Sequence, residues 1–282
     1  MTEKDITEKT LESYNDVFAD IMNVLLFQGA NIVRENELTN AQPRSYYKAD
    51  GRIREQERDV SKYWRKSKIQ IAMLGIENQT KEDADMPLRI IGYDGAAYRN
   101  QIKKGQRARY PVTSIVLYFN YRNRWRAPLH LSECFNIPKE LKPYVNDYQV
   151  HLFEIAWLTR EQVELFQSDF KIVADYFVQM RENNDYIPTR ETIHHVQEVL
   201  QLMAVMCEDT RFEEAYQEKG SGTNMCEYLD RLEARGKSKG EIIGTITTCR
   251  EFGLDDAKIF ERITEKFHLD EQEARKYLEE VS

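Results

Sequence analysis

The sequence lacks an apolar run long enough to cross a membrane, since no stretch approaches the roughly 18 consecutive apolar residues of a spanning helix. Its first residues, MTEKDITEKTLE, carry charges where a secretory signal peptide has an apolar core. We therefore expect a cytoplasmic protein with no membrane partner.

Cysteine is scarce and scattered along the chain. No Cys-x-x-Cys pair of the kind that marks zinc or redox sites occurs among the four cysteines, which are Cys134, Cys207, Cys226 and Cys249. Free cysteines are among the most frequently buried residues. We therefore expect reduced thiols with a structural role.

Positive charge is in deficit overall, with a formal net charge of −8 over 282 residues. This balance disfavours nucleic-acid binding, because phosphate groups are neutralised by Lys and Arg. However, residues 99–126 hold eight Lys or Arg and no Asp or Glu, whereas residues 251–282 hold ten acidic and five basic residues. The basic segment is either a solvated face or a surface that follows a DNA backbone, and in the second case Arg107 and Arg109 are the expected contacts.

Hydrophobic periodicity predicts the order of the secondary-structure elements. Apolar residues at helical spacing indicate a helix over about residues 10–28, and a second helix from Pro87 to Lys103 has its proline in the first turn. Apolar and β-branched runs predict strands over residues 68–77, 110–119 and 148–158. The later residues read as helices, so we expect an α/β fold with a mixed α+β sheet and a helical C-terminal half.

The helical half contains signals for its own subdivision. A capping-box pattern at 159–162 is expected to open a helix that reaches Met180, and Pro188 is expected to open another that reaches Met206. The string GKSKG, residues 236–240, reads as a hinge. We therefore expect three parts: a core over residues 1–158, a helical extension packed on it over 159–235, and an acidic helical tail over 236–282.

The tail is expected to form two short helices, over residues 255–267 and 270–280, which are too small to enclose a core. Their apolar residues would then be exposed, namely Ile259, Ile263, Phe267, Ala274 and Tyr277. An acidic surface repels DNA, so we expect the tail to dock on the basic segment of its own chain or on a partner subunit. The second case would make the protein a homo-oligomer.

The candidate for chemistry is a carboxylate at a strand end. In GIENQT, residues 75–80, successive side chains point to opposite faces, so Glu77 and Gln79 emerge together while Asn78 points away. If a hairpin or wide loop brings Asp59 to Glu77, two carboxylates and the Asn78 carbonyl form the kind of oxygen set that holds Mg²⁺. Such an ion can activate a water molecule and neutralise charge on a phosphate. The alternative is an aspartate in a surface turn and a solvated strand end.

Five sequence blocks carry a resemblance to a known family. They are YNDVFADIMNVLLF at 14–27, RDVSKYW at 58–64, GIENQT at 75–80, MPLRIIGYDGAAYRNQI at 86–102, and PVTSIVLYF at 111–119 followed by Trp125. Over residues 10–215 the chain resembles the bacterial YhgA-like family of transposases and recombination-promoting nucleases, within the PD-(D/E)XK nuclease superfamily. The resemblance implies a restriction-endonuclease-like core that hydrolyses DNA phosphodiester bonds with Mg²⁺, Mn²⁺ or Ca²⁺, in recombination or mobile-element DNA processing.

The resemblance also implies roles for individual residues. Asp59 and Glu77 would be catalytic carboxylates that bind the metal, and Asn78 would add its carbonyl oxygen. An acidic residue of the first helix would join the metal site, with Asp16 the better match and Asp20 the second.

The chain departs from the superfamily pattern at two positions. Arg58 stands where a proline usually precedes the first carboxylate, and that proline shapes a turn without taking part in the chemistry. Gln79, the third catalytic position, stands where the superfamily has a lysine; its amide can form hydrogen bonds but carries no charge. Lys62 could compensate as a neighbouring base and DNA contact, and Arg89 and Tyr93 would face the phosphate. Alternatively, the amide at this position indicates a catalytically weak or inactive DNA-binding or regulatory protein on the same scaffold.

Overall fold

The computed structural model describes residues 11–41, 44–49, 52–57, 59–67, 69–103, 109–206, 212, 225–267, 269 and 271–280. The chain divides into two compact units, residues 1–219 and 220–282. This division falls N-terminal to the boundary expected at residue 235, and the boundary expected at residue 158 stays a prediction. Among the helices of the described ranges, none combines the length and apolar character that crossing a membrane requires.

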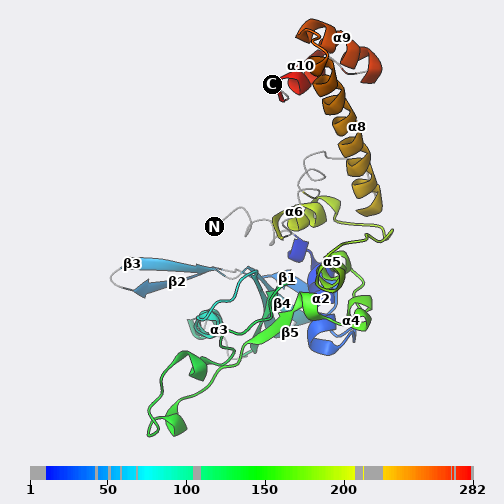
Figure 1. The fold of residues 1–282 in the computed structure, drawn as a ribbon. Helices are drawn as coiled ribbons and strands as arrows, with labels where there is room; N and C mark the ends of the chain where they lie inside the picture. Colours follow the sequence, from blue (N-terminus) through cyan, green and yellow to red (C-terminus); the bar gives the residue numbers. More distant parts are fainter. Residues whose placement is uncertain are drawn as a thin grey trace. The chain divides into compact units, whose positions relative to one another are not determined.

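A five-stranded mixed sheet forms the centre of the first unit, in the order β1-β4-β5-β6-β7 (Figure 1). The strands are β1 (Leu38–Asn40), β4 (Val60–Lys66), β5 (Ile69–Gln79), β6 (Val112–Tyr118) and β7 (His151–Glu154). Neighbours are antiparallel from β1 to β5 and parallel from β5 to β7. A separate antiparallel pair, β2 (Arg44–Ala49) and β3 (Arg52–Glu57), lies between β1 and β4 in the chain. The expected mixed α/β class is therefore confirmed.

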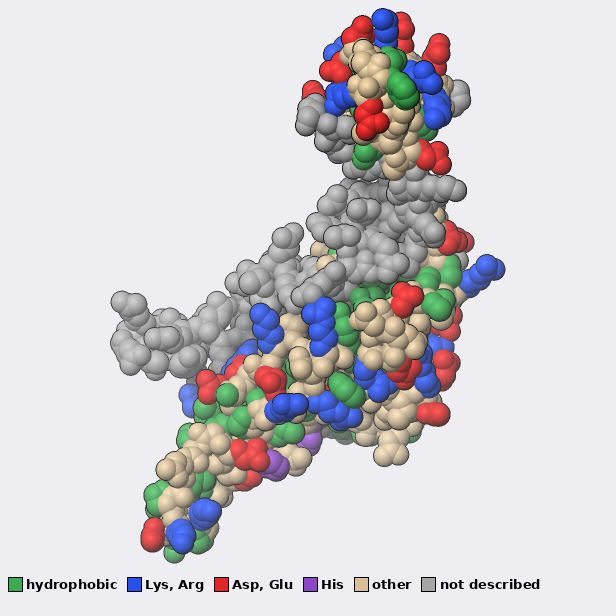
Figure 2. All heavy atoms as spheres, in the orientation of Figure 1, with side chains coloured by type: hydrophobic (Ala, Val, Ile, Leu, Met, Phe, Trp, Pro, Cys, Tyr) green, Lys and Arg blue, Asp and Glu red, His purple; other side chains and the backbone are tan. Residues whose placement is uncertain are grey.

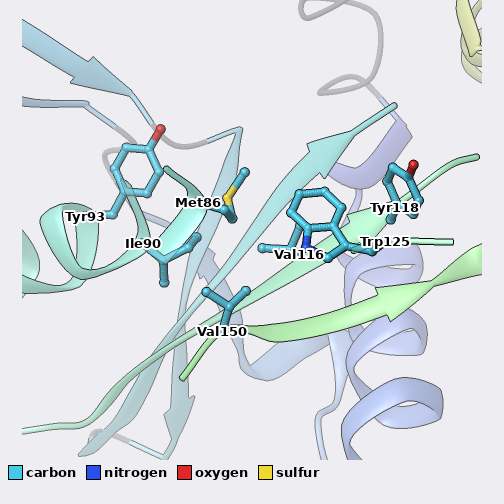
Figure 3. Close-up of a cluster of buried hydrophobic side chains, with 7 residues drawn as sticks. All are labelled: Met86, Ile90, Tyr93, Val116, Tyr118, Trp125 and Val150. Carbon is cyan, nitrogen blue, oxygen red and sulfur yellow. The ribbon is translucent and has the colours of Figure 1, made fainter. Parts of the chain in front are cut away.

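Helix α3 (Met86–Lys103) covers one face of the sheet. Its apolar side chains meet those of β6 and the segment after it in one buried cluster, formed by Met86, Ile90, Tyr93, Val116, Tyr118, Trp125 and Val150 (Figure 3). In the β5–β6 register, Glu77 is level with Val116 and Gln79 with Tyr118. Paired residues on neighbouring strands point to the same face, so Glu77 and Gln79 share the α3 face.

Helix α2 (Asn15–Phe27) packs on the opposite face, where Lys62 of β4 fixes its start. Lys62 is 1% exposed, and its ammonium group donates to the Ser13 carbonyl at 2.6 Å and to the side-chain oxygens of Asn15 and Asn40, each at 2.7 Å. Burial lowers the pKa of Lys62 to about 8, although the negative charge of Asp16 opposes this change. All three ammonium donors thus have acceptors, which ties α2 to β1 and β4.

Helices α4 (Arg160–Glu164), α5 (Phe170–Asn183) and α6 (Val196–Met206) follow β7. The capping box is confirmed, because the Thr159 hydroxyl accepts from the Gln162 backbone while the Gln162 side chain accepts from the Thr159 backbone. The single helix expected through Met180 is wrong. The backbone N–H groups of residues 167 and 168 donate to the Asp20 carboxylate, at 2.9 and 2.7 Å, between α4 and α5.

The helix expected from Pro188 begins only at Val196. Just before that start, the backbone N–H groups of His194 and His195 donate to the buried Asp169 carboxylate. These hydrogen bonds satisfy donors that precede the first helical turn. The expected end of the helix, at Met206, agrees with the structure.

The second unit contains α8 (Met225–Glu251), α9 (Asp256–Phe267) and α10 (Glu271–Glu280). The two terminal helices agree with the sequence, but the expected hinge is wrong, because residues 236–240 lie inside α8. The continuous helix brings apolar partners to the tail, in a buried cluster of Ile242, Ile246, Cys249, Ile259, Ile263 and Ala274. The expectation that this tail exposes its isoleucines is therefore also wrong.

We predict that Lys62→Met lowers the free energy of unfolding by about 3 kcal/mol, because three acceptors around a buried site lose their donor. Urea denaturation at pH 7 measures the change. The control is Lys66→Met, an exposed position on the same strand, which should stay within about 0.5 kcal/mol of the parent. Equal stabilities of the two variants would contradict a role for Lys62 in fixing α2.

Candidate active site

The β4–β5 ladder brings Asp59 and Glu77 to the same face. Val60 is level with Ile76, and continuing this antiparallel register by one residue sets Asp59 opposite Glu77. The Asp59 carboxylate accepts a hydrogen bond of 2.7 Å from the backbone N–H of Asn78. The Asp59 side chain thus accepts the hydrogen bond of the Asn78 backbone at the point where the backbone pairing of β4 with β5 ends.

Glu77 lies deep in this site and forms an ion pair with Arg89 of α3. The Glu77 side chain is 2% exposed and that of Arg89 is 37% exposed. Arg89 Nη2 contacts Glu77 Oε1, and the other terminal nitrogen, Nη1, donates to Asp83 Oδ2 at 2.8 Å. Gln79 Nε2 lies 3.5 Å from the same Glu77 oxygen, and the Tyr93 hydroxyl lies 3.4 Å from Arg89 Nη2. Strand β5 and helix α3 therefore supply one continuous polar cluster.

The charges of this cluster shift the pKa values of its members. Burial is the largest single effect on Arg89 and disfavours its charge, but Glu77, Tyr93 and Asp83 together outweigh burial, so the pKa of Arg89 is raised. Burial and the negative charge of Glu77 raise the pKa of Tyr93 to about 12, with a smaller contribution from Asp59. At neutral pH the site therefore presents a permanent guanidinium and a neutral phenol.

The structure does not bring Asp16 or Asp20 to this cluster, because both belong to α2 on the other face of the sheet. Asp16 pairs with His195 Nε2 at 3.0 Å, and Asp20 accepts backbone hydrogen bonds from residues 167 and 168. Both aspartates line a separate cavity of about 340 Å³. The expected participation of Asp16 in the Asp59–Glu77 site is therefore corrected.

Lys62 is also on the wrong face to serve as a base for Glu77 or as a DNA contact. Lys62 is level with Leu74, and Leu74 is three residues from Glu77 on the same strand, so the two side chains point to opposite faces. The Lys62 ammonium group is enclosed by acceptors. The Asn78 side chain points to the same face and donates to Glu12 at 2.7 Å. Those two expectations for Lys62 are wrong, since buried contacts use its donors.

The basic segment is only partly described. Arg107 lies outside the described residues, and Arg109 is exposed. Arg124 pairs with Glu154 at 3.1 Å and lies over the Trp157 ring. On the face drawn in Figure 2, Lys and Arg side chains are interspersed with Asp and Glu.

A family model described as "Putative transposase, YhgA-like" matches residues 62–208, which is more than half of the chain. The chain belongs to this family. The match contains Glu77, Gln79, Arg89 and Tyr93 and begins just after Asp59. Comparisons with curated proteins and with solved structures gave no match.

Two carboxylates of this YhgA-like protein were not expected from the sequence. Asp83 accepts from the Asp85 backbone at 2.9 Å and binds Arg89, and an aspartate in the turn before a helix is the signal that could have found it. Asp94 is 1% exposed and accepts from Ser114 Oγ at 2.6 Å and from the Tyr148 hydroxyl. Asp94 thereby fastens α3 to β6, and no local pattern distinguishes it from a solvated residue.

The residues at the β4–β5 end fit a magnesium-type ion by their chemistry. Asp59 and Glu77 are hard oxygen donors, and Mg²⁺ commonly takes one or two carboxylates and leaves its other positions to water and phosphate. Within the described ranges, no group of three or more His, Cys, Asp or Glu side chains is arranged to hold a metal. Among the described residues, the carboxylates considered for such an ion are therefore Asp59 and Glu77, and Glu77 already has Arg89 as its counter-ion.

We predict that Arg89→Gln lowers the free energy of unfolding by about 3 kcal/mol, because it removes the counter-ion of the buried Glu77 carboxylate. Glu77→Gln should cost less, about 1 kcal/mol, because Arg89 is more than one third exposed and keeps Asp83 as a partner. The double variant should lose clearly less than the sum, which a double-mutant cycle in urea measures. A matched cycle on Lys171 and Glu164, a pair at 3.0 Å whose glutamate is 71% exposed, should show coupling below about 0.5 kcal/mol. Equal coupling in the two cycles would mean that the Glu77–Arg89 pair behaves as a surface contact.

Proposed function

We propose that this protein is a metal-dependent DNA endonuclease that hydrolyses phosphodiester bonds in recombination or mobile-element DNA processing. The observation that carries the proposal is the convergence of Asp59, Glu77 and Gln79 on one sheet face beneath Arg89 and Tyr93. Membership of the YhgA-like family supports a DNA-processing role. The antiparallel β4–β5 pair, the following helix α3 and the parallel strand β6 are compatible with the PD-(D/E)XK superfamily.

In this proposal Asp59 and Glu77 hold Mg²⁺, or Mn²⁺ or Ca²⁺ in its place, and Asn78 contributes its carbonyl oxygen. The bound ion supplies activation of water and neutralisation of charge on the phosphate. The Asn78 N–H orients the Asp59 carboxylate, because it donates to one of its two oxygens.

The remaining side chains act on the phosphate and the water. Arg89 carries a planar guanidinium with paired donors, which suits two oxygens of one phosphate group. Tyr93, with its pKa raised to about 12, acts as a neutral hydrogen-bond donor at physiological pH. Gln79 positions water through its amide and neither takes up a proton nor supplies charge.

A second candidate function is DNA binding or regulation without efficient cleavage. Two observations favour it: an amide stands at Gln79, and Arg89 neutralises Glu77. A carboxylate that keeps its guanidinium partner would bind a divalent ion poorly. The two candidates therefore differ in whether a divalent ion reaches Glu77.

We predict that the protein nicks supercoiled plasmid with Mg²⁺ or Mn²⁺, and that Glu77→Gln and Asp59→Asn each reduce the rate by at least about 100-fold. Gel electrophoresis of the plasmid forms measures the rate. Asp85→Asn, an exposed carboxylate in the turn before α3, is the control and should nick normally. DNA binding without nicking in Mg²⁺, Mn²⁺ and Ca²⁺ would favour the second function, whereas nicking that survives Glu77→Gln would place the chemistry elsewhere.

We also predict that replacing Arg107 and Arg109 with alanine weakens DNA binding uniformly across sequences. Each lost phosphate contact should reduce the slope of log affinity against log salt by about 0.9. Fluorescence anisotropy at several salt concentrations gives the slope. The matched control is Lys258→Ala with Lys276→Ala, two exposed lysines of the second unit, and equal slopes in both double variants would make the basic segment a solvated face.

A further inference from the structure

Arg89 binds two carboxylates that differ in their surroundings. The Glu77 side chain is 2% exposed, whereas that of Asp83 is 27% exposed. The two contacts use different nitrogens, Nη2 for Glu77 and Nη1 for Asp83. A rotation of the guanidinium can therefore break the first contact and keep the second.

Asp83 is held in place independently of Arg89. Its Oδ1 accepts from the backbone N–H of Asp85 at 2.9 Å, which leaves Oδ2 directed at Arg89. The backbone N–H of Arg89 donates to the Asp85 carbonyl at 3.0 Å. Asp83 and Arg89 therefore belong to one short hydrogen-bonded segment at the start of α3. The carboxylate thus stays beside the guanidinium whichever way Arg89 turns.

A divalent ion and the guanidinium compete for Glu77. The Glu77 oxygen that accepts from Arg89 Nη2 also lies 3.5 Å from Gln79 Nε2, so this side of the carboxylate is already crowded by donors. Two positive charges on one buried carboxylate repel more strongly than they would in water, because the surrounding dielectric constant is lower. Occupation of Glu77 by an ion therefore favours departure of Arg89.

We propose that Asp83 is a positioning residue that keeps Arg89 in the site in two alternative states. In the resting state the guanidinium neutralises Glu77; when Glu77 takes a divalent ion, the guanidinium turns away to bind a substrate phosphate oxygen, still held by Asp83. This inference rests on the proposed function and adds the regulation of the same site. By linkage, phosphate binding and ion binding then strengthen each other.

The test is a calorimetric titration of Mn²⁺ into the full-length protein without DNA. Arg89→Gln removes the competing cation, so we expect it to bind Mn²⁺ about tenfold more tightly than the parent, which corresponds to about 1.4 kcal/mol. Asp83→Asn removes the group that holds the guanidinium after it leaves Glu77, so we expect binding weaker by about threefold or more. A simple count of charges predicts the same two signs, so the double variant Arg89→Gln/Asp83→Asn decides between the two accounts. If Asp83 acts through Arg89, the double variant should bind Mn²⁺ as tightly as Arg89→Gln alone. If Asp83→Asn weakens binding equally in both backgrounds, the proposal is overturned.

The matched control is Arg99→Gln, which removes one positive charge from an exposed position of the same helix. We expect its Mn²⁺ affinity to stay within about twofold of the parent, because Arg99 is exposed and ten residues along the helix from Arg89, so water and salt screen its charge. A gain equal to that of Arg89→Gln would show a general effect of net charge and would overturn the proposal.

Thermal unfolding with and without Mn²⁺ provides a second readout that does not depend on activity. Arg89→Gln should unfold at a lower temperature than the parent without the ion and gain more stability when Mn²⁺ is added, because a tighter ligand stabilises more at equal concentration. If Arg89→Gln does not fold without the ion, Arg89→Lys replaces it. Lysine keeps the charge but lacks the fork that reaches both carboxylates, so its Mn²⁺ affinity should lie between those of the parent and the tenfold gain.

The outcomes also separate this inference from the proposed function. Unchanged or weaker Mn²⁺ binding by Arg89→Gln, in a protein that binds Mn²⁺ and nicks DNA, overturns the inference and leaves the endonuclease standing. Absence of Mn²⁺ binding in both the parent and Arg89→Gln overturns both.

Discussion

The antiparallel register between β4 and β5 is the constraint on which the rest of the first unit depends. With Val60 level with Ile76, Asp59 and Glu77 face α3 while Lys62 and Asn78 face α2. A slip of one residue would exchange the faces of every side chain on the strand. The same register therefore decides which polar groups remain accessible from α3 and which are enclosed as structural contacts.

Each face resolves its buried charge in a different way. On the α2 face, Lys62 meets three neutral oxygen acceptors, so hydrogen bonds stabilise its charge and use all three of its donors. On the α3 face, Glu77 meets the charged group of Arg89, which is itself more than one third exposed. A buried carboxylate whose counter-ion reaches the surface can exchange that counter-ion, because the partner that leaves returns to water or to another anion. The enclosed Lys62 therefore suits a structural role, and the exchangeable Glu77–Arg89 pair suits a binding site.

Sequence patterns predicted the parts of the fold that depend on local signals. Strands β5 and β6 are apolar runs, and alternation along β5 was enough to set Glu77 and Gln79 together. Strand β4 was missed because VSKYWRK carries charges at Lys62, Arg65 and Lys66, and nothing in the sequence shows that the first of these is enclosed. The partners of Lys62 lie 22 to 49 residues away, so its burial is a tertiary property. The supposed hinge at 236–240 failed for a related reason, since packing of α8 against α9 and α10 outweighs the cost of about 1 kcal/mol per helical glycine.

The candidate site shows the same limit of local sequence signals, and a second element supplies the charge that the strand lacks. Alternation places an amide at residue 79 beside Glu77, and an amide brings no charge. Helix α3 supplies the missing charge from another part of the chain, because Arg89 Nη2 contacts the same Glu77 oxygen that Gln79 approaches. Asp83 and Asp94 fix this helix at two points, one at its start through Arg89 and one in its middle through Ser114 of β6. The position of the Arg89 guanidinium thus follows from how α3 is fastened to the sheet. The strand motif alone reveals only the uncharged Gln79.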